Sequence, residues 1–245
     1  ESSRRLLGSP GEAQDLLRRA KITGYQVVPA GTNYTFFVVM APDGGEPFLG
    51  VYKPRQGENP LWDYPDGTLY RREHASYVAS VELGWPNIPP TVIRDEGPFG
   101  PGMTQLYVPP DPEQDFLAFR GSFAEQLKQI ALFDIVVNNG DRKAGHCLLG
   151  TDGRVWAIDH GLTFNPATRL RTVLWDYCGD PIPETLLDRL RALLSDSRST
   201  ALREKLSHDL SPADVDGFFH RVERVVREGR YPRLDPERNV PWPLY

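Results

Sequence analysis

The chain has 245 residues, of which 40% are hydrophobic and 25% are charged, and it carries a formal net charge of -5. This length suffices for one large domain or for two small lobes around a cleft. The acidic balance argues against a basic nucleic-acid-binding protein, and no apolar run approaches the ~20 residues of a membrane span. We therefore expect no nucleic-acid partner and no membrane span.

The two cysteines, Cys147 and Cys178, are too few for a disulfide framework and favour reduced thiols. Cys147 lies in an apolar, strand-like run, so a small buried hydrophobic residue is its expected role. No signal-peptide pattern opens the sequence. These features indicate a cytoplasmic protein, which we expect to be a monomer.

The first 108 residues are β-rich, with alternating apolar and polar positions and turn residues such as those at 43–45. The expected strands are 25–28, 34–40, 48–53, 89–93 and 103–108. Apolar spacing predicts a short helix over 12–21 and a longer helix over 69–83, which ends at a glycine.

The run Pro109-Pro110-Asp111-Pro112 breaks this pattern and predicts a join between two lobes. The remainder is mainly helical apart from one short hairpin with its tip at 151–153. The expected helices are 122–138, 184–194, 200–206 and 212–227. The predicted fold class is therefore α+β, with an N-lobe over residues 1–108, a C-lobe over residues 109–245 and a ligand site where they meet.

Two acidic residues, Asp141 and Asp159, lie on loops at opposite ends of the short buried hairpin. Kinases hold a catalytic carboxylate beside a metal-binding carboxylate in this way. Asp141 would align an acceptor hydroxyl and accept its proton, Lys143 would neutralise charge on the transferred phosphate, and Asp159 would hold the metal ion. An isolated Asn-Gly-Asp is usually a plain turn. Here apolar segments flank the loop on both sides, which favours a polar loop pinned within a core.

A cation and an orienting carboxylate are also available. Lys53 ends a predicted strand and would contact the nucleotide phosphates, while Glu73 in the next helix would pair with it. An exposed strand-end lysine and an exposed helix glutamate are the alternatives. Backbone N–H groups of the turn Gly31-Thr32-Asn33 could approach phosphate. The backbone of Leu106-Tyr107-Val108, just before the linker, could hydrogen-bond a purine.

His146 follows Asp141 at the spacing where kinase catalytic loops carry an asparagine metal ligand. Neutral imidazole suits Mn²⁺ better than Mg²⁺, so we expect Mn²⁺ to support activity at least as well as Mg²⁺. A purely structural histidine is the alternative interpretation, for His146 and also for His160.

Together these motifs resemble the phosphatidylinositol 3-/4-kinase superfamily, most closely bacterial relatives of the type II phosphatidylinositol 4-kinases. The similarity covers roughly residues 25–175. It rests on Gly50-Val51-Tyr52-Lys53-Pro54, Arg72-Glu73-His74-Ala75, Ile88-Pro89-Pro90-Thr91, the loop from Asn139 to His146, and Ile158-Asp159-His160-Gly161-Leu162-Thr163-Phe164. Two family asparagines are replaced, one by His146 and one by His160.

The resemblance implies a two-lobed, kinase-like fold and an ATP-dependent phosphotransferase that uses Mg²⁺ or Mn²⁺. The acceptor would be an unidentified protein or small-molecule hydroxyl, because no obvious basic or amphipathic docking segment supports a lipid substrate. Two alternatives stay open. One is transfer of AMP on the same scaffold, and the other is a catalytically silent nucleotide-binding module, which the replacement by His146 favours.

Overall fold

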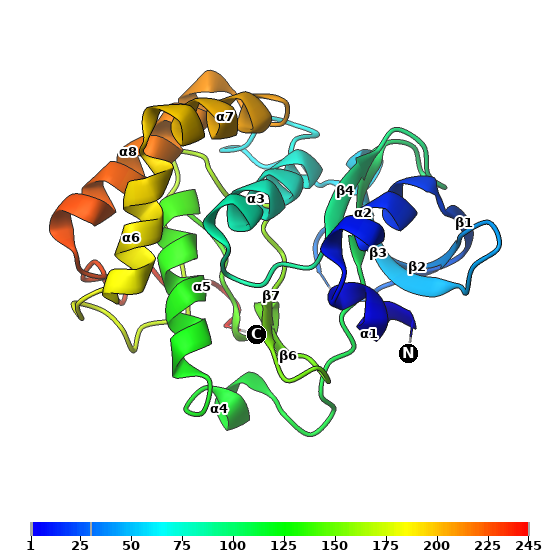
Figure 1. Ribbon diagram of the computed structural model, residues 1–245, viewed down its shortest axis with the longest axis horizontal. Coiled ribbons are helices and arrows are strands. Elements are labelled where there is room, and N and C mark those ends of the chain that lie inside the picture. Colours follow the sequence, from blue (N-terminus) through cyan, green and yellow to red (C-terminus); the bar gives the residue numbers. More distant parts are fainter. Residues whose placement is uncertain (1, 30, 245) are drawn as a thin grey trace.

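The computed structural model of the protein describes residues 2–29 and 31–244 and combines an antiparallel sheet with a helical region (Figure 1). The helices are α1 (Ser2–Leu7), α2 (Pro10–Arg19), α3 (Leu69–Leu83), α4 (Phe116–Phe119), α5 (Ala124–Val137), α6 (Glu184–Leu193), α7 (Asp196–Ser207) and α8 (Pro212–Glu228). The strands are β1 (Lys21–Val27), β2 (Phe36–Ala41), β3 (Phe48–Pro54), β4 (Thr91–Arg94), β5 (Gly102–Leu106), β6 (Cys147–Leu149) and β7 (Val155–Ala157). Two 3₁₀ turns are η1 (Arg55–Gly57) and η2 (Ala144–His146).

Strands β1 to β5 form one antiparallel sheet in the order β1-β2-β3-β5-β4. Because side chains alternate across a strand, Phe36, Val38 and Met40 of β2 face the core beneath α1 and α2. In β3 the inward residues include Tyr52, so the neighbouring Lys53 lies on the opposite face of the sheet. Because successive side chains of β3 point to opposite faces, the lysine is directed away from the apolar core of the sheet.

Helix α3 has a defined start and a defined end. The carboxylate of Glu58 accepts hydrogen bonds from the backbone N–H groups of Leu69 (3.1 Å) and Tyr70 (2.8 Å), which have no partner within the helix. Its negative charge also suits the positive end of the helix dipole. At the other end Gly84 adopts φ 78°, a left-handed conformation that glycine tolerates best. These ends fix Glu73 one turn into the helix.

The apolar side chains form two clusters. The sheet cluster includes Leu17, Val38 and Tyr52, and the helical cluster includes Ile130 and Phe218. Helix α3 contributes to the helical cluster rather than to the sheet cluster, through Ala75, Tyr77, Ala79 and Leu83. A helix that precedes the linker in sequence therefore packs with the helical region, and the lobe boundary between residues 108 and 109 stays a prediction.

The hairpin of β6 and β7 brings the two acidic loops together. Cys147 pairs with Ala157, and the backbone N–H of Ile158 donates to the carbonyl of His146 at 3.0 Å. The start of β6 and the end of β7 thus lie side by side. Asp141 and Asp159 consequently emerge at the same end of the hairpin, and the expectation that their loops lie at opposite ends of it is wrong.

The predicted α+β class is confirmed, with differences in detail. Helix α1 was not predicted, and the helix predicted over 12–21 is α2, which ends two residues earlier, so that Lys21 begins β1. The strand predicted over 103–108 ends at Leu106, and the helix predicted over 200–206 is the longer α7. Within residues 2–29 and 31–244, no helix is long and apolar enough to cross a lipid bilayer.

Candidate active site

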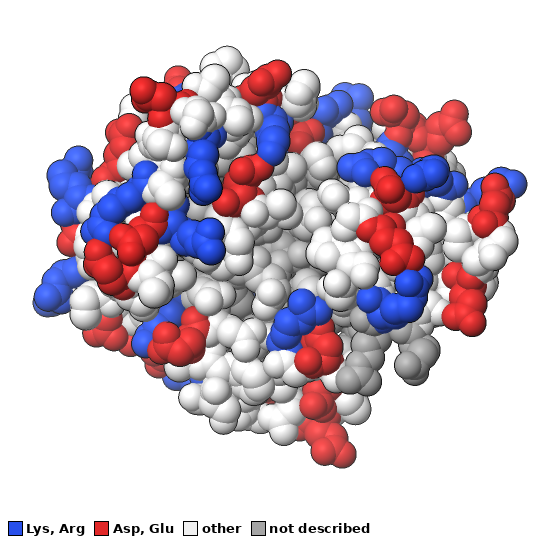
Figure 2. Space-filling view, in the orientation of Figure 1, with Lys and Arg blue, Asp and Glu red and all other residues white. Residues whose placement is uncertain are grey.

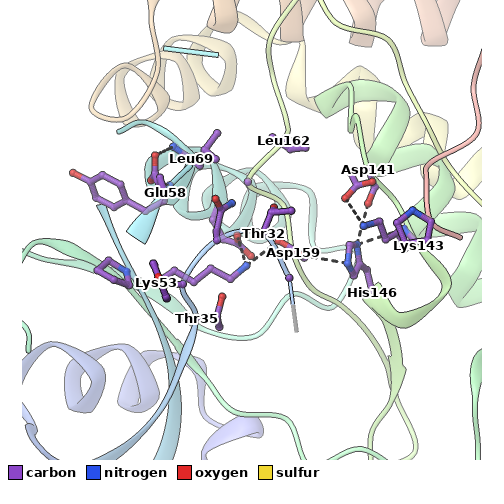
Figure 3. Close-up of a pocket in the computed structure, with 18 residues that line it drawn as sticks. Thr32, Thr35, Lys53, Glu58, Leu69, Asp141, Lys143, His146, Asp159 and Leu162 are labelled. Carbon is purple, nitrogen blue, oxygen red and sulfur yellow. Dashed lines mark hydrogen bonds and ion pairs between the residues drawn. The ribbon is translucent and has the colours of Figure 1, made fainter. Parts of the chain in front are cut away.

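A cavity of about 510 Å³ is lined by residues of the sheet, of α3 and of both acidic loops (Figure 3). Most of the predicted site residues line it: Gly31, Thr32, Asn33, Lys53, Glu73, Asp141, Lys143, His146 and Asp159. Residues more than 100 positions apart in the sequence thus share one cavity.

Lys53 lies between two carboxylates. Its Nζ atom is 2.9 Å from Glu73 Oε2 and 2.9 Å from Asp159 Oδ1. Burial alone would lower the pKa of Lys53, but the two carboxylates raise it above its ordinary value, so the ammonium stays charged. Glu73 is buried and also accepts a hydrogen bond from the backbone N–H of His160 at 3.1 Å. The ammonium is therefore held at a fixed place, as a phosphate-binding cation requires.

The carboxylate of Asp159 contacts both Lys53 and His146. The residue adopts φ 59°, in the left-handed region, which few side-chain-bearing residues other than asparagine and aspartate adopt. Partial removal from water opposes its ionisation, but the charge of Lys53 holds the pKa of Asp159 well below its usual range. Its other oxygen, Oδ2, faces His146 Nε2 at 3.2 Å, on the side away from Lys53 (Figure 3).

The pair of Asp159 and His146 fits a divalent cation. His146 Nδ1 lies 3.0 Å from the backbone carbonyl of Asp141 and 3.4 Å from the backbone N–H of Lys143. In the tautomer that carries its proton on Nδ1, the ring donates to the carbonyl and directs the Nε2 lone pair at the carboxylate of Asp159. Burial lowers the pKa of His146 to about 4, so the ring is neutral near pH 7. Two electron-rich atoms at this separation match adjacent ligands of one metal ion with bonds of about 2.1 Å. In the described residues no group of three or more His, Cys, Asp or Glu side chains converges, so other oxygens must complete such a shell.

Asp141 faces the same cavity and carries a perturbed carboxyl group. Burial raises the pKa of Asp141 to about 6, although the ammonium of Lys143, 3.2 Å away, opposes this shift. Its backbone N–H donates to Asn139 Oδ1 at 2.9 Å, which shapes the turn. A carboxyl with a pKa near the physiological range is suited to general base catalysis.

A buried network that sequence reasoning did not predict holds this loop. Arg142 is fully buried and binds the carboxylate of Asp134 through two nitrogens, at 2.8 and 3.0 Å. It also donates to the carbonyls of His146 (3.0 Å) and Ile158 (2.8 Å), and so joins the loop before β6 to the end of β7. One signal was available, because Asp134 interrupts an apolar helix stretch and must be paired if it is buried.

His160 and the segment 106–108 lie outside the cavity. His160 is fully buried, and its Nε2 accepts a hydrogen bond from Arg142 at 2.8 Å, as expected of a structural histidine. The side chains of Leu106 and Val108 pack into the sheet cluster. Tyr107 contacts Phe37 edge to face, with ring centroids 5.6 Å apart. The backbone contact to a purine therefore stays a prediction.

The turn at residues 31–33 is anchored from outside the sheet. Gly31 has φ 102°, which favours glycine. The backbone N–H of Asn59 donates to Asn33 Oδ1 at 2.8 Å, and the Asn59 side chain donates to the carbonyl of Thr32. The turn is thereby held at the edge of the cavity.

An antiparallel sheet beside a helical region, with a lysine–glutamate pair and two acidic loops around one cavity, defines a kinase-like protein. Residues 74–212 match the family described as Phosphatidylinositol 3- and 4-kinase. A relative, Protein Rv2133c of Mycobacterium tuberculosis, is 36% identical, over 80% of this chain and 82% of that protein. The chain therefore belongs to the phosphatidylinositol 3- and 4-kinase family, whose members are kinase-type phosphotransferases.

Solved structures share the fold at low sequence identity. The Golgi casein kinase superposes with a TM-score of 0.56 at 14% identity, covering 92% of this chain and 79% of that chain. Hydra Fam20 gives a TM-score of 0.57 at 17% identity, covering 88% and 87%. The Helicobacter pylori proinflammatory kinase CtkA gives 0.51 at 11% identity, covering 87% and 94%. The predicted kinase-like fold is thus confirmed.

Proposed function

We propose that this protein transfers the terminal phosphoryl group of ATP to a hydroxyl group of a protein or small molecule. One observation carries the proposal: the Lys53 ammonium lies 2.9 Å from both Glu73 and Asp159 in a cavity that Asp141 also lines. Phosphoryl transfer depends mainly on positioning and on charge stabilisation, and these groups supply both. A solved Golgi casein kinase with Mn/ADP bound has the same fold, with a TM-score of 0.54 at 13% identity, which supports nucleotide and metal use.

The nucleotide would lie along the face of the sheet that carries Lys53. Lys53 would bind the phosphates, Glu73 would keep the ammonium oriented, and the turn at 31–33 would cover the phosphates with backbone N–H groups. Further along the same face, Leu49 (42% exposed) and Phe37 (38% exposed) offer an apolar surface. This surface, with the backbone of 106–108 beside it, suits a flat purine base.

Asp159 and His146 would hold Mg²⁺ or Mn²⁺, which when bound neutralises charge on the nucleotide phosphates. The charged side chains of the cavity support this assignment. Lys53 and Lys143 bring two positive charges against the four carboxyl groups of Glu58, Glu73, Asp141 and Asp159, while His146 is neutral. The remaining phosphate charge calls for a divalent ion, and a nitrogen ligand favours Mn²⁺ over Mg²⁺.

Asp141 would receive the acceptor hydroxyl. The carboxylate would align the attacking oxygen and accept its proton as the bond to phosphorus forms and the bond to the leaving oxygen of ADP breaks. Lys143 lies 3.2 Å from Asp141 and would meet the transferred phosphate with its charge.

Several finer assignments belong to the same proposal. We infer a position near the bacterial relatives of type II phosphatidylinositol 4-kinases, a cytoplasmic monomer, and a boundary between two lobes at residues 108 and 109. On the face shown in Figure 2, basic and acidic side chains are interspersed rather than gathered into one basic field. This distribution supports a partner other than nucleic acid.

Transfer from ATP labelled in the γ-phosphate, with Mn²⁺ or Mg²⁺ and a cell extract as the acceptor source, tests the proposal. Asp141→Ala and Asp159→Ala are expected to abolish transfer while far-UV circular dichroism stays unchanged. Asp188→Ala, an exposed acid on α6, is the matched control and should transfer normally. Full transfer by either cavity variant would refute the roles assigned to these carboxylates.

The same assay separates the two alternatives. An enzyme that transfers AMP would label its acceptor from the α-phosphate of ATP and not from the γ-phosphate. A silent binding module would be stabilised against heat by ATP without any turnover, because a ligand that binds only the folded state raises apparent stability.

A further inference from the structure

Arg72, next to Glu73 on α3, joins three separate segments through one buried guanidinium group. Its Nη2 and Nη1 atoms lie 3.1 and 3.3 Å from the carboxylate oxygens of Asp214, at the start of α8, and Nη1 also donates to the carbonyl of Thr163 at 2.8 Å. Thr163 belongs to the loop that begins at Asp159. The side chains of Arg72 and Asp214 are only 3% and 7% exposed, so this pair is screened little by solvent.

Neighbouring residues strengthen the same attachment. Arg71 donates to the carbonyl of His208 at 3.2 Å, and His74 Nδ1 lies 2.5 Å from Asp209 Oδ2. Three of four consecutive residues of α3 therefore bind the segment 208–214. The fourth, Glu73, is directed at Lys53 instead.

The packing agrees with these polar contacts. Helix α3 contacts α6 and α7 as well as β4 and β5 (Figure 1), and four of its buried apolar residues, Ala75, Tyr77, Ala79 and Leu83, belong to the helical cluster. Asp214 itself is held by Ser211, whose hydroxyl donates to Oδ2 at 2.7 Å in a capping box at the start of α8. The anchor for α3 is thus a rigid helix terminus.

Resting on the proposed function, we propose that Arg72 and Asp214 are positioning residues for phosphoryl transfer. They fix Glu73 of α3 and the loop of Asp159 relative to each other. The Lys53 ammonium can then meet both carboxylates at once. The pair acts through Glu73 and Asp159 and touches neither nucleotide nor acceptor.

Three variants and one control separate positioning from stability. Arg72→Met and Asp214→Asn each leave one charge buried without a partner and should lower the melting temperature, whereas the double variant leaves none and should regain much of it. We expect the kcat of all three to fall by about tenfold or more, because small displacements of catalytic groups have large effects on rate. Val215→Ala, a buried core truncation beside Asp214, should lower the melting temperature without this loss of kcat.

Two further readouts exclude a merely structural role. In a Glu73→Gln background, Arg72→Met should lower kcat by a smaller factor than in the wild-type background, since one of the two groups that it positions is already gone. Hydrogen exchange of the α3 backbone amides at residues 72–76 should accelerate in the double variant. A double variant with wild-type kcat and wild-type exchange overturns the inference. Absence of turnover in the wild-type protein would instead refute the proposed function, and the exchange measurement would still decide whether this pair positions α3.

Discussion

The acid side of the pH–rate profile should report the ionisation of Asp141. Burial raises the pKa of this carboxyl to about 6, and the proposed general base must be ionised. The ionised fraction is then about one half at pH 6, about one tenth at pH 5 and above about 95% at pH 7.5. We expect kcat/KM, which reports ionisations of the free enzyme, to fall about tenfold for each pH unit below 6.

Substitution of Lys143 tests whether Asp141 is the group that titrates on the acid side of the profile. The Lys143 ammonium lies 3.2 Å from the carboxylate and lowers the pKa of Asp141. Lys143→Met should therefore move the acid limb to higher pH, by about one unit, the low end of the effect of a neighbouring opposite charge. The terminal phosphate of the nucleotide also titrates near pH 6, but it does so equally with both proteins.

Nucleotide turnover measured between pH 5 and 8 gives the pH at which the rate falls to half on the acid side of the profile. This midpoint does not depend on the maximal rate, although Lys143→Met is expected to lower that rate as well. Lys128→Met removes a lysine of α5 that pairs with Glu125 outside the cavity, and it should leave the limb in place. A limb that stays fixed or moves to lower pH in Lys143→Met would contradict the assignment of Asp141 as the titrating base.

Three further predictions concern stability and binding. In the folded protein the pKa of Asp141 is above its unfolded value, so the stability that its carboxyl contributes is present below about pH 4 and lost as the pH rises through about 6. Asp141→Asn should then raise the free energy of unfolding at pH 7.5 by about 1 kcal/mol, allowing for its 26% exposure, as urea titration would measure. Lys53→Met should lose the ~2.7 kcal/mol of stabilisation that ATP gives at 100 times its Kd, as a thermal shift assay would show. Arg142→Met should lower the free energy of unfolding by about 3–5 kcal/mol, since it leaves the buried carboxylate of Asp134 unpaired. Equal urea midpoints for this variant and the wild-type protein would contradict the prediction.

Local patterns predicted the parts of the molecule that local physics determines. The β-prone run that ends at Lys53 indicated a strand, and the flanking apolar runs around Asp141 indicated a loop held in a core. Kinase-like spacing related these residues to Glu73 and Asp159, and one cavity contains all four. Their chemical roles remain predictions.

The parts that escaped prediction depend on contacts distant in sequence or on local backbone conformation. Arg72 and Asp214 are 142 positions apart, and a single sequence contains no signal that pairs them. The cap of α3 comes from Glu58, eleven residues before the N–H group of Leu69. The left-handed backbone at Asp159 is a conformation that aspartate adopts only occasionally, so no sequence pattern signals it. Helix α1 spans six residues, too few for an apolar period to be recognised.

The orientation of the His146 ring bears on which metal ion the site prefers, because a backbone contact in the loop before β6 sets that orientation. When Nδ1 carries the proton and donates to the carbonyl of Asp141, the ring presents the Nε2 lone pair to Asp159, and with a pKa of about 4 it carries no second proton at neutral pH. In that tautomer the lone pair and the carboxylate oxygen, 3.2 Å apart, repel each other unless a cation lies between them. His146→Asn would replace the nitrogen by an oxygen ligand, which Mg²⁺ accepts readily. The ratio of the rate with Mn²⁺ to the rate with Mg²⁺ should therefore fall in this variant, whereas an unchanged ratio would show that His146 is not a ligand and that the repulsion is relieved in another way.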